Sequence, residues 1–366
     1  MLSSIQQLHL LDQKVSMNLT SESQALEQDS TPSRNSYYTL PMKANGTKVA
    51  AGVVETLNPA PTPLTHQVTI NLTPNSKVLI QGITQPLGSY YTARMKAYGT
   101  NVVAGVSAGQ GGQELHGIPV FDLVEQVLPQ TGPIEATIIF VESYRVLDAA
   151  LEAMDAEIPL IILVTEGVPP LDMVRLLRKA EGTGTLILGP SSSGIIVPGK
   201  VLLGTQESKF YSPGPVGLIA RTGALAYEVA LGLTQRQIGQ SIAVNLGSAA
   251  IVGSSFSQWL QILAMDRSTE VIVLVDQTGG LIDDATAEYI AEAIDKPVIA
   301  YVAGSHTPLD KQVSDTSAII AAQLSGPVTN ASTAQHKVAA FKQANIPVAE
   351  RPSQIPELVT KALKKG

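Results

Sequence analysis

From Lys77 onwards, short apolar runs alternate with stretches of helical periodicity, and this alternation constrains the fold more than any other feature of the chain. The runs are KVLIQG (77–82), NVVAGV (101–106), ATIIFV (136–141), LIILVTEG (160–167) and TLILGP (185–190). They are short for helices and apolar on both faces, like strands of a parallel sheet that helices cover on both sides. The alternation therefore predicts an α/β fold.

A second series of the same kind follows a bridge at 194–214 that is interrupted by Pro and Gly. Its expected strands lie at 215–221, 241–247, 270–276 and 297–304. Its expected helices lie at 223–236, 256–266, 285–294 and 333–344. We therefore predict two α/β domains, at 76–208 and 209–366. Residues 1–75 are rich in Ser, Thr, Asn, Gln and Pro, which predicts a disordered or linker-like extension, with a partner-binding arm as the alternative.

Composition excludes several classes of protein. Charged residues make up 15% and aromatic residues 4% of the 366 residues, so the interior must be built from aliphatic side chains. The net charge of −7 disfavours a protein that coats nucleic acid. The absence of cysteine excludes disulfides, iron–sulfur clusters, thiolate zinc sites and cysteine nucleophiles. We find no apolar run of ~20 residues and no basic leader, and expect a cytoplasmic protein.

Two glycine-rich loops follow adjacent predicted strands, at GITQPLG (82–88) and VSAGQGG (106–112). In open α/β sheets such loops bring the amides of a helix N-terminus to an anion at the carboxyl ends of the strands. Gly88 falls where a helix must pack closely on the sheet. Gln85 and Pro86 occupy the stretch where a dinucleotide fingerprint needs a glycine. The loops indicate a nucleotide-like ligand, and ordinary βα turns remain the alternative.

The order of the motifs resembles the alpha subunit of succinyl-CoA synthetase, in the family of ADP-forming acyl-CoA synthetases. The matching segments, which run from Lys77 to the C-terminus, are QGITQPLG, AYGTNVVAGVSAGQGG, HGIPVF, TEGVP, GPSSSGIIVPG, ARTGALAYE, GSSF, TGG and SAII. The resemblance implies a Rossmann-like CoA-binding domain followed by a flavodoxin-like ligase domain. It also implies an ATP-grasp beta-type subunit as partner, so we expect an oligomer.

The same resemblance implies that the residues of phosphoryl transfer are substituted. The family's histidine takes the phosphoryl group, and its place is held by Asp315. The family's supporting glutamate falls on Gln277. A carboxylate is not the neutral imidazole that this chemistry uses, and an amide cannot stabilise an imidazolium by charge. The two substitutions fit each other, because an amide can bond to a carboxylate that a second carboxylate would repel.

The resemblance also implies an altered CoA site. Gln110 stands for a lysine near a CoA phosphate, and losing one charged hydrogen bond costs roughly 1.5–3 kcal/mol. Ser191 and Ser193 stand for the Asn and Pro of a GPN-x-PG turn. We predict a weakened CoA site, and no metal, with the residues Gly82, Thr84, Gln85, Gly88, Val106, Gln110, Glu166 and Ser191.

A second site is predicted where a strand ends and a helix begins at Arg221–Thr222–Gly223. Thr222 and Gly223 would offer an N-cap hydroxyl and free amides to a phosphate or other anion. The alternative is an ordinary helix cap.

Three functions remain open from the sequence. The first is an alpha-subunit-like protein without phosphoryl transfer, acting as a CoA or nucleotide sensor or as an assembly partner. The second is an active ADP-forming acyl-CoA ligase that uses another phosphoryl carrier, such as an acyl phosphate on Asp315. The third is a structural protein that binds no CoA.

Overall fold

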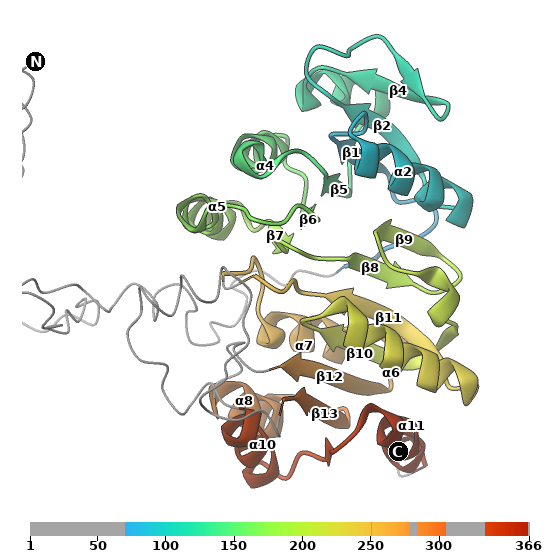
Figure 1. Cartoon of the computed structure of the whole chain (residues 1–366), viewed down its shortest axis with the longest axis vertical. Helices are drawn as coiled ribbons and strands as arrows, with labels where there is room; N and C mark the ends of the chain where they lie inside the picture. The colour runs from blue at the N-terminus through green and yellow to red at the C-terminus, as the bar shows by residue number, and fades with distance from the viewer. Residues whose placement is uncertain (1–69, 250, 278–283, 305–333, 365–366) are drawn as a thin grey trace, which may run out of the picture. The chain divides into compact units, whose positions relative to one another are not determined.

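The computed structural model describes residues 70–249, 251–277, 284–304 and 334–364 (Figure 1). These residues form two mixed, mostly parallel sheets covered by helices, which confirms the predicted pair of Rossmann-like and flavodoxin-like α/β domains. Residues 1–69 of the expected extension and Asp315 lie outside the described residues.

The first sheet has seven strands in the order β3-β4-β2-β1-β5-β6-β7. Its strands are β1 (Val78–Gln81), β2 (Val102–Val106), β3 (Glu114–Leu115), β4 (Ile118–Phe121), β5 (Ala136–Ile139), β6 (Leu160–Leu163) and β7 (Leu186–Leu188). All neighbours are parallel except β3 and β4, which form an antiparallel pair. Strand β1 is buried along its length and lies between β2 and β5. The loop after β1 therefore lies at the centre of the sheet edge, at the point where the strand order reverses.

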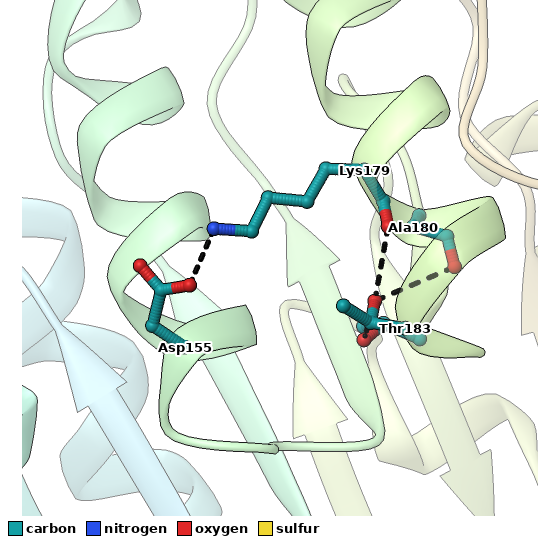
Figure 2. Close-up of polar contacts among 5 residues, drawn as sticks. Asp155, Lys179, Ala180 and Thr183 are labelled. Atoms are coloured by element: carbon teal, nitrogen blue, oxygen red, sulfur yellow. Dashed lines mark hydrogen bonds and ion pairs between the residues drawn. The ribbon is translucent and has the colours of Figure 1, made fainter.

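The helices of the first domain follow its strands. They are α2 (Pro86–Tyr98), α3 (Leu128–Thr131), α4 (Val146–Asp155) and α5 (Pro170–Thr183). Helices α4 and α5 contact each other beside β5 and β6, where Lys179 forms an ion pair with Asp155 (Figure 2). Thr183 is the last residue of α5, and its hydroxyl donates to the carbonyl groups of Lys179 at 3.2 Å and Ala180 at 3.4 Å (Figure 2).

The second sheet also has seven strands, in the order β14-β13-β12-β10-β11-β8-β9. Its strands are β8 (Gly194–Val197), β9 (Val201–Gly204), β10 (Pro213–Ala220), β11 (Gln240–Asn245), β12 (Val271–Gln277), β13 (Val298–Ala303) and β14 (Val348–Ala349). Its helices are α6 (Gly223–Gln235), α7 (Phe256–Met265), α8 (Asp284–Ala293), α10 (Ala334–Gln343) and α11 (Ile355–Leu363).

Residues 194–214 are more than the bridge expected from the sequence. They contain the hairpin β8–β9, in which Ile195 pairs with Leu203, and β8 joins the second sheet antiparallel to β11. Glycines with positive φ stand at the start of β8, in the turn and at the end of β9. These glycines suggested a loop, whereas they delimit two short buried strands. The second sheet therefore includes residues before 209.

Helix α2 connects the two sheets. Thr100, just after the helix, exchanges hydrogen bonds of 2.7 and 3.1 Å with the backbone of Leu202 in β9. The backbone amide of Gly199 donates to Tyr98 Oη at 2.8 Å. One cluster of buried apolar side chains accordingly includes residues of both sheets. Within the described ranges, no helix is both long enough and apolar enough to cross a membrane.

Candidate functional sites

The loop after β1 is a tight turn that only glycine can make. Gly82 has φ +78° and donates from its amide to the carbonyl of Val106 at 2.7 Å. Its carbonyl accepts from Gln85 N at 3.0 Å, which closes the turn. A Cβ at residue 88 would lie 2.1 Å from Gly82 O. Gly88 is therefore required by the approach of α2 to the strand end, as the sequence predicted.

The second glycine-rich loop lies against the first. Thr84 Oγ1 donates to Ser107 Oγ at 2.9 Å, so the turn after β1 is bound to the loop after β2. Gln113 Nε2 donates to Gln110 Oε1 at 2.8 Å, which holds the side-chain amide of Gln110. The structure thus brings together the predicted residues of both loops, Gly82, Thr84, Gln85, Gly88, Val106 and Gln110.

A carboxylate that the sequence reasoning missed takes part in the second loop. Asp122 Oδ1 accepts from the backbone amide of Gly111 at 2.9 Å. That amide is thereby engaged by a negative charge and is not free for a phosphate oxygen. Asp122 directly follows β4, which neighbours β2, and only the predicted position of that strand end could have signalled it.

The remaining predicted CoA residues lie along the same edge of the sheet. Glu166 follows β6, and Ser191 follows β7. Ser191 has φ +57° and donates from its amide to the carbonyl of Thr165 at 3.1 Å, so the two segments are joined. Strand β5 separates β6 from β1. Glu166 and Ser191 therefore lie further along the same edge of the sheet, on the other side of β5 from Gly82. They do not surround Gly82.

Thr222 occupies the N-cap position of α6, but it does not form the ordinary helix cap that the sequence analysis gave as the alternative. Its side chain makes no capping hydrogen bond, and its buried hydroxyl has no partner. Ser193 Oγ is also buried and interacts with the phenol of Tyr227. Nearby, Arg221 donates from Nη2 to the carbonyl of Ala249 at 2.8 Å.

Gln277 ends β12, beside the strand that leads to Thr222. Ala220 of β10 pairs with Val275 of β12, so Gln277 and Thr222 both lie two residues past this pair. The structure therefore brings Gln277 to the same edge of the sheet as the candidate anion site at Thr222 and Gly223. It places no part of Asp315, which lies outside the described residues.

A buried ion pair lies at the end of β12. Lys337 Nζ of α10 lies 2.6 Å from Asp276 Oδ2 and donates to the carbonyl of Gln277 at 3.0 Å. The two side chains are 0% and 1% exposed. Sequence reasoning missed this pair, because the residues stand 61 positions apart; the only signal was an aspartate near the end of an apolar strand.

Another ion pair lies between α2 and the segment that follows β9. Arg94 donates to both carboxylate oxygens of Glu207 at 2.6 and 3.0 Å, and this bonding lowers the pKa of Glu207. Tyr227 of α6 lies near this carboxylate, and burial raises the pKa of its phenol. No group of three or more His, Asp or Glu in the described part of the chain could hold a metal ion.

Two family models match the chain. The model described as a CoA binding domain matches residues 73–167, and the model described as a succinyl-CoA ligase like flavodoxin domain matches residues 213–360. A succinate–CoA ligase [ADP-forming] subunit alpha 2 from Archaeoglobus fulgidus is 38% identical over 288 residues, which cover 79% of this chain and 97% of the relative. The corresponding alpha subunit from Aquifex aeolicus is 37% identical over 292 residues, covering 79% and 93%.

Among solved structures, the chain is similar to an ATP citrate lyase from Methanosaeta concilii in complex with (3S)-citryl-CoA. The TM-score is 0.71 at 18% identity, over 81% of this chain and 51% of the lyase chain. A dinucleotide-forming acetyl-coenzyme A synthetase from Ca. Korarchaeum cryptofilum gives a TM-score of 0.60 at 22% identity, over 76% and 58%. The chain thus spans about half of these larger chains, and the likeness shows a shared fold.

Proposed function

Because the chain belongs to the family of succinate–CoA ligase alpha subunits, we propose that it is an alpha-type, CoA-binding subunit that no longer transfers a phosphoryl group through histidine. What supports this proposal is the sequence resemblance, which puts Asp315 at the position of the family's histidine. Gln277 at the position of the glutamate supports it, because a neutral amide gives an imidazolium no counter-charge. The protein would serve as a CoA-responsive or assembly partner of an ATP-grasp beta-type subunit.

Binding of CoA is supported by the backbone of the two loops. Gly82 and Gly88 keep the tight turn, and Thr84 joins it to the second loop. Affinity would be low, because Gln110 supplies no positive charge and Asp122 occupies the amide of Gly111.

A titration of the full chain with CoA, followed by calorimetry, tests this binding. Gln110→Lys should tighten CoA binding roughly 10- to 150-fold, because one charged hydrogen bond is worth roughly 1.5–3 kcal/mol. Gln113→Lys is the matched control, since it adds the same charge three residues further along. Absence of CoA binding in both the wild type and Gln110→Lys would refute the CoA-binding part of the proposal and favour a structural protein.

Loss of phosphoryl transfer is tested separately by succinyl-CoA synthesis. The full chain is mixed with the beta subunit of a related ligase, ATP, succinate and CoA. The wild type should form no product. The double variant Asp315→His with Gln277→Glu, which restores the family's two residues, should form succinyl-CoA. Steady product formation by the wild type would contradict the proposal.

The alternative is an active ligase that carries the phosphoryl group on Asp315. The observation that favours it is the candidate anion site at Thr222 and Gly223, which keeps a helix N-terminus beside the end of β12. An acyl phosphate on Asp315 would be cleaved by hydroxylamine, and Asp315→Asn would abolish it. A label with both properties would establish this alternative.

A further inference from the structure

Helix α2 follows a strand of the first sheet, but it packs on the second sheet as well. Its contacts with β9 are more extensive than its contacts with either β1 or β2. The backbone amide of Gly204, at the end of β9, donates to Met95 Sδ at 3.2 Å, and Thr100 exchanges two hydrogen bonds with Leu202. The direction of α2, which carries the candidate CoA turn at its start, is therefore set by both sheets.

Arg94 joins α2 to the segment after β9 at a point closer to the candidate CoA turn than Tyr98 or Thr100 does. It follows Gly88 by less than two turns of the helix, roughly 9 Å. Its guanidinium donates to both carboxylate oxygens of Glu207 at 2.6 and 3.0 Å. Such a bidentate pair fixes the relative direction of the two groups, which a single hydrogen bond does not.

A stack of side chains connects Arg94 to the turn itself. The guanidinium lies over the ring of Tyr91, 6.0 Å from its centroid, and Tyr91 is stacked on Phe140 at 6.2 Å. Phe140 directly precedes Val141, whose backbone nitrogen lies 2.9 Å from the place that a Cβ of Gly82 would take. The first residue of the turn is therefore packed against the segment on which this stack rests.

The surroundings of Arg94 suit a residue that positions the turn and does not bind CoA itself. Both of its terminal nitrogens are engaged by Glu207, so its charge is compensated. We propose that Arg94 is a positioning residue for CoA. Through Glu207 it fixes α2, and with it the turn from Gly82 to Gly88, so that the second sheet influences the affinity of the first domain for CoA. This inference rests on the proposed binding of CoA.

Calorimetric titration of the full chain with CoA tests this role. Arg94→Met, which keeps an apolar chain on the Tyr91 ring, and Glu207→Gln should each weaken CoA binding about two- to fivefold, as expected for a partly exposed pair. Arg94→Glu alone places two carboxylates against each other and should weaken binding more. Combining it with Glu207→Arg restores a pair across the same contact and should recover most of the affinity.

Two outcomes of the titration would overturn the inference. Unchanged or tighter CoA binding by Glu207→Gln would mean that Arg94 either binds a CoA phosphate directly or plays no part in the site. Lys179→Met is the matched control, because it breaks the ion pair with Asp155 that joins α4 to α5 in the same domain (Figure 2). It should bind CoA like the wild type. An equal loss in Lys179→Met and Arg94→Met would assign the effect to general stability.

Amide hydrogen exchange, followed by mass spectrometry, reads the state of the turn without CoA. The amides of Gln85 and Ser89 donate to the carbonyls of Gly82 and Gln85. In Arg94→Met and in Glu207→Gln, the peptide that contains these amides should exchange about two- to fivefold faster, whereas the peptide that covers β6 should exchange at the wild-type rate. Unchanged exchange in the turn would overturn the inference.

The two measurements separate this inference from the proposed function. A wild type that binds no CoA would refute the proposed CoA binding, and with it the role of Arg94 in that binding. Faster exchange in the variants would still show that Arg94 holds the turn. Normal CoA binding by the wild type, with unchanged affinity and exchange in both variants, would overturn the positioning role alone.

Discussion

At the scale of single residues, glycines define the candidate CoA loop by excluding a side chain. Gly88 is the clearest case, because a Cβ there would lie 2.1 Å from the carbonyl oxygen of Gly82. Sequence reasoning reached this conclusion from the position of Gly88 at the start of a helix. It could not assign Asp122, because the hydrogen bond to Gly111 depends on which strand lies beside β2.

Two glycine-to-alanine substitutions should have opposite effects on stability. Gly88→Ala forces α2 away from the strand end and should cost about 1–3 kcal/mol, as overpacking does. Gly182→Ala meets no atom within 4 Å, and it lies in helix α5 without a positive φ. It should stabilise the protein by about 0.5–1 kcal/mol. Urea unfolding measures both, and destabilisation by Gly182→Ala together with a neutral Gly88→Ala would contradict the packing described.

The buried pair of Lys337 and Asp276 should behave as one unit. Lys337→Met leaves Asp276 as an uncompensated buried carboxylate and should lower the free energy of unfolding by about 3–5 kcal/mol. The double variant with Asp276→Leu removes both charges and should recover much of that loss. Chemical denaturation provides the measurement. Lys361→Met, which breaks an exposed pair with Glu357, is the control and should leave the midpoint unchanged. Additive losses in the double variant would argue against a coupled pair.

At the scale of elements, the alternation of apolar runs and helices predicted most strands of both sheets. It failed at β8 and β9, because each is a four-residue run enclosed by glycines that resembles a loop. Their strand character comes from pairing with each other and from the pairing of β8 with β11, which lies about 50 residues later in the chain. Ser193, which directly precedes β8, owes its place beside α6 to this pairing.

The ion pair between α2 and the segment before η4 (Ser208–Phe210) should give a pH-dependent contribution to stability. Bonding to Arg94 lowers the pKa of Glu207, so the folded state favours the carboxylate. Its stabilisation is complete above the ordinary pKa of about 4.3 and is lost as the pH falls through the lower, folded-state pKa. The pair is 28% and 31% exposed, which limits the effect to about 1 kcal/mol or less.

Thermal unfolding of the wild type and Glu207→Gln as a function of pH checks this contribution. The wild type should have the higher midpoint at neutral pH, and the two curves should converge in acid, because Gln cannot titrate. A difference that stays constant from neutral to acidic pH would show that the carboxylate charge is not responsible. Glu135→Gln provides a comparison, since Glu135 binds a backbone amide and not a cation.

At the scale of the whole molecule, the two domains of the family cover most of the described chain, and our proposal is that the reactive residues are changed. The matches to the CoA-binding and ligase-type models cover residues 73–167 and 213–360. The 288 residues that match the Archaeoglobus fulgidus alpha subunit are 97% of that relative but 79% of this chain, so about a fifth of this chain has no counterpart there. The loops of both candidate sites contain glycines, and in our proposal Gln110, Gln277 and Asp315 stand where the family has groups that carry charge or a phosphoryl group.

Labelling with ATP radioactive in its γ-phosphate tests the central claim most directly. The full chain is incubated with magnesium, the labelled ATP and the beta subunit of a related ligase, and protein-bound phosphate is counted. The wild type should incorporate no phosphate, and Asp315→His with Gln277→Glu should acquire an acid-labile, hydroxylamine-resistant label typical of phosphohistidine. Stoichiometric labelling of the wild type, with loss of the label in Asp315→Asn, would contradict the account and identify an active phosphoryl carrier.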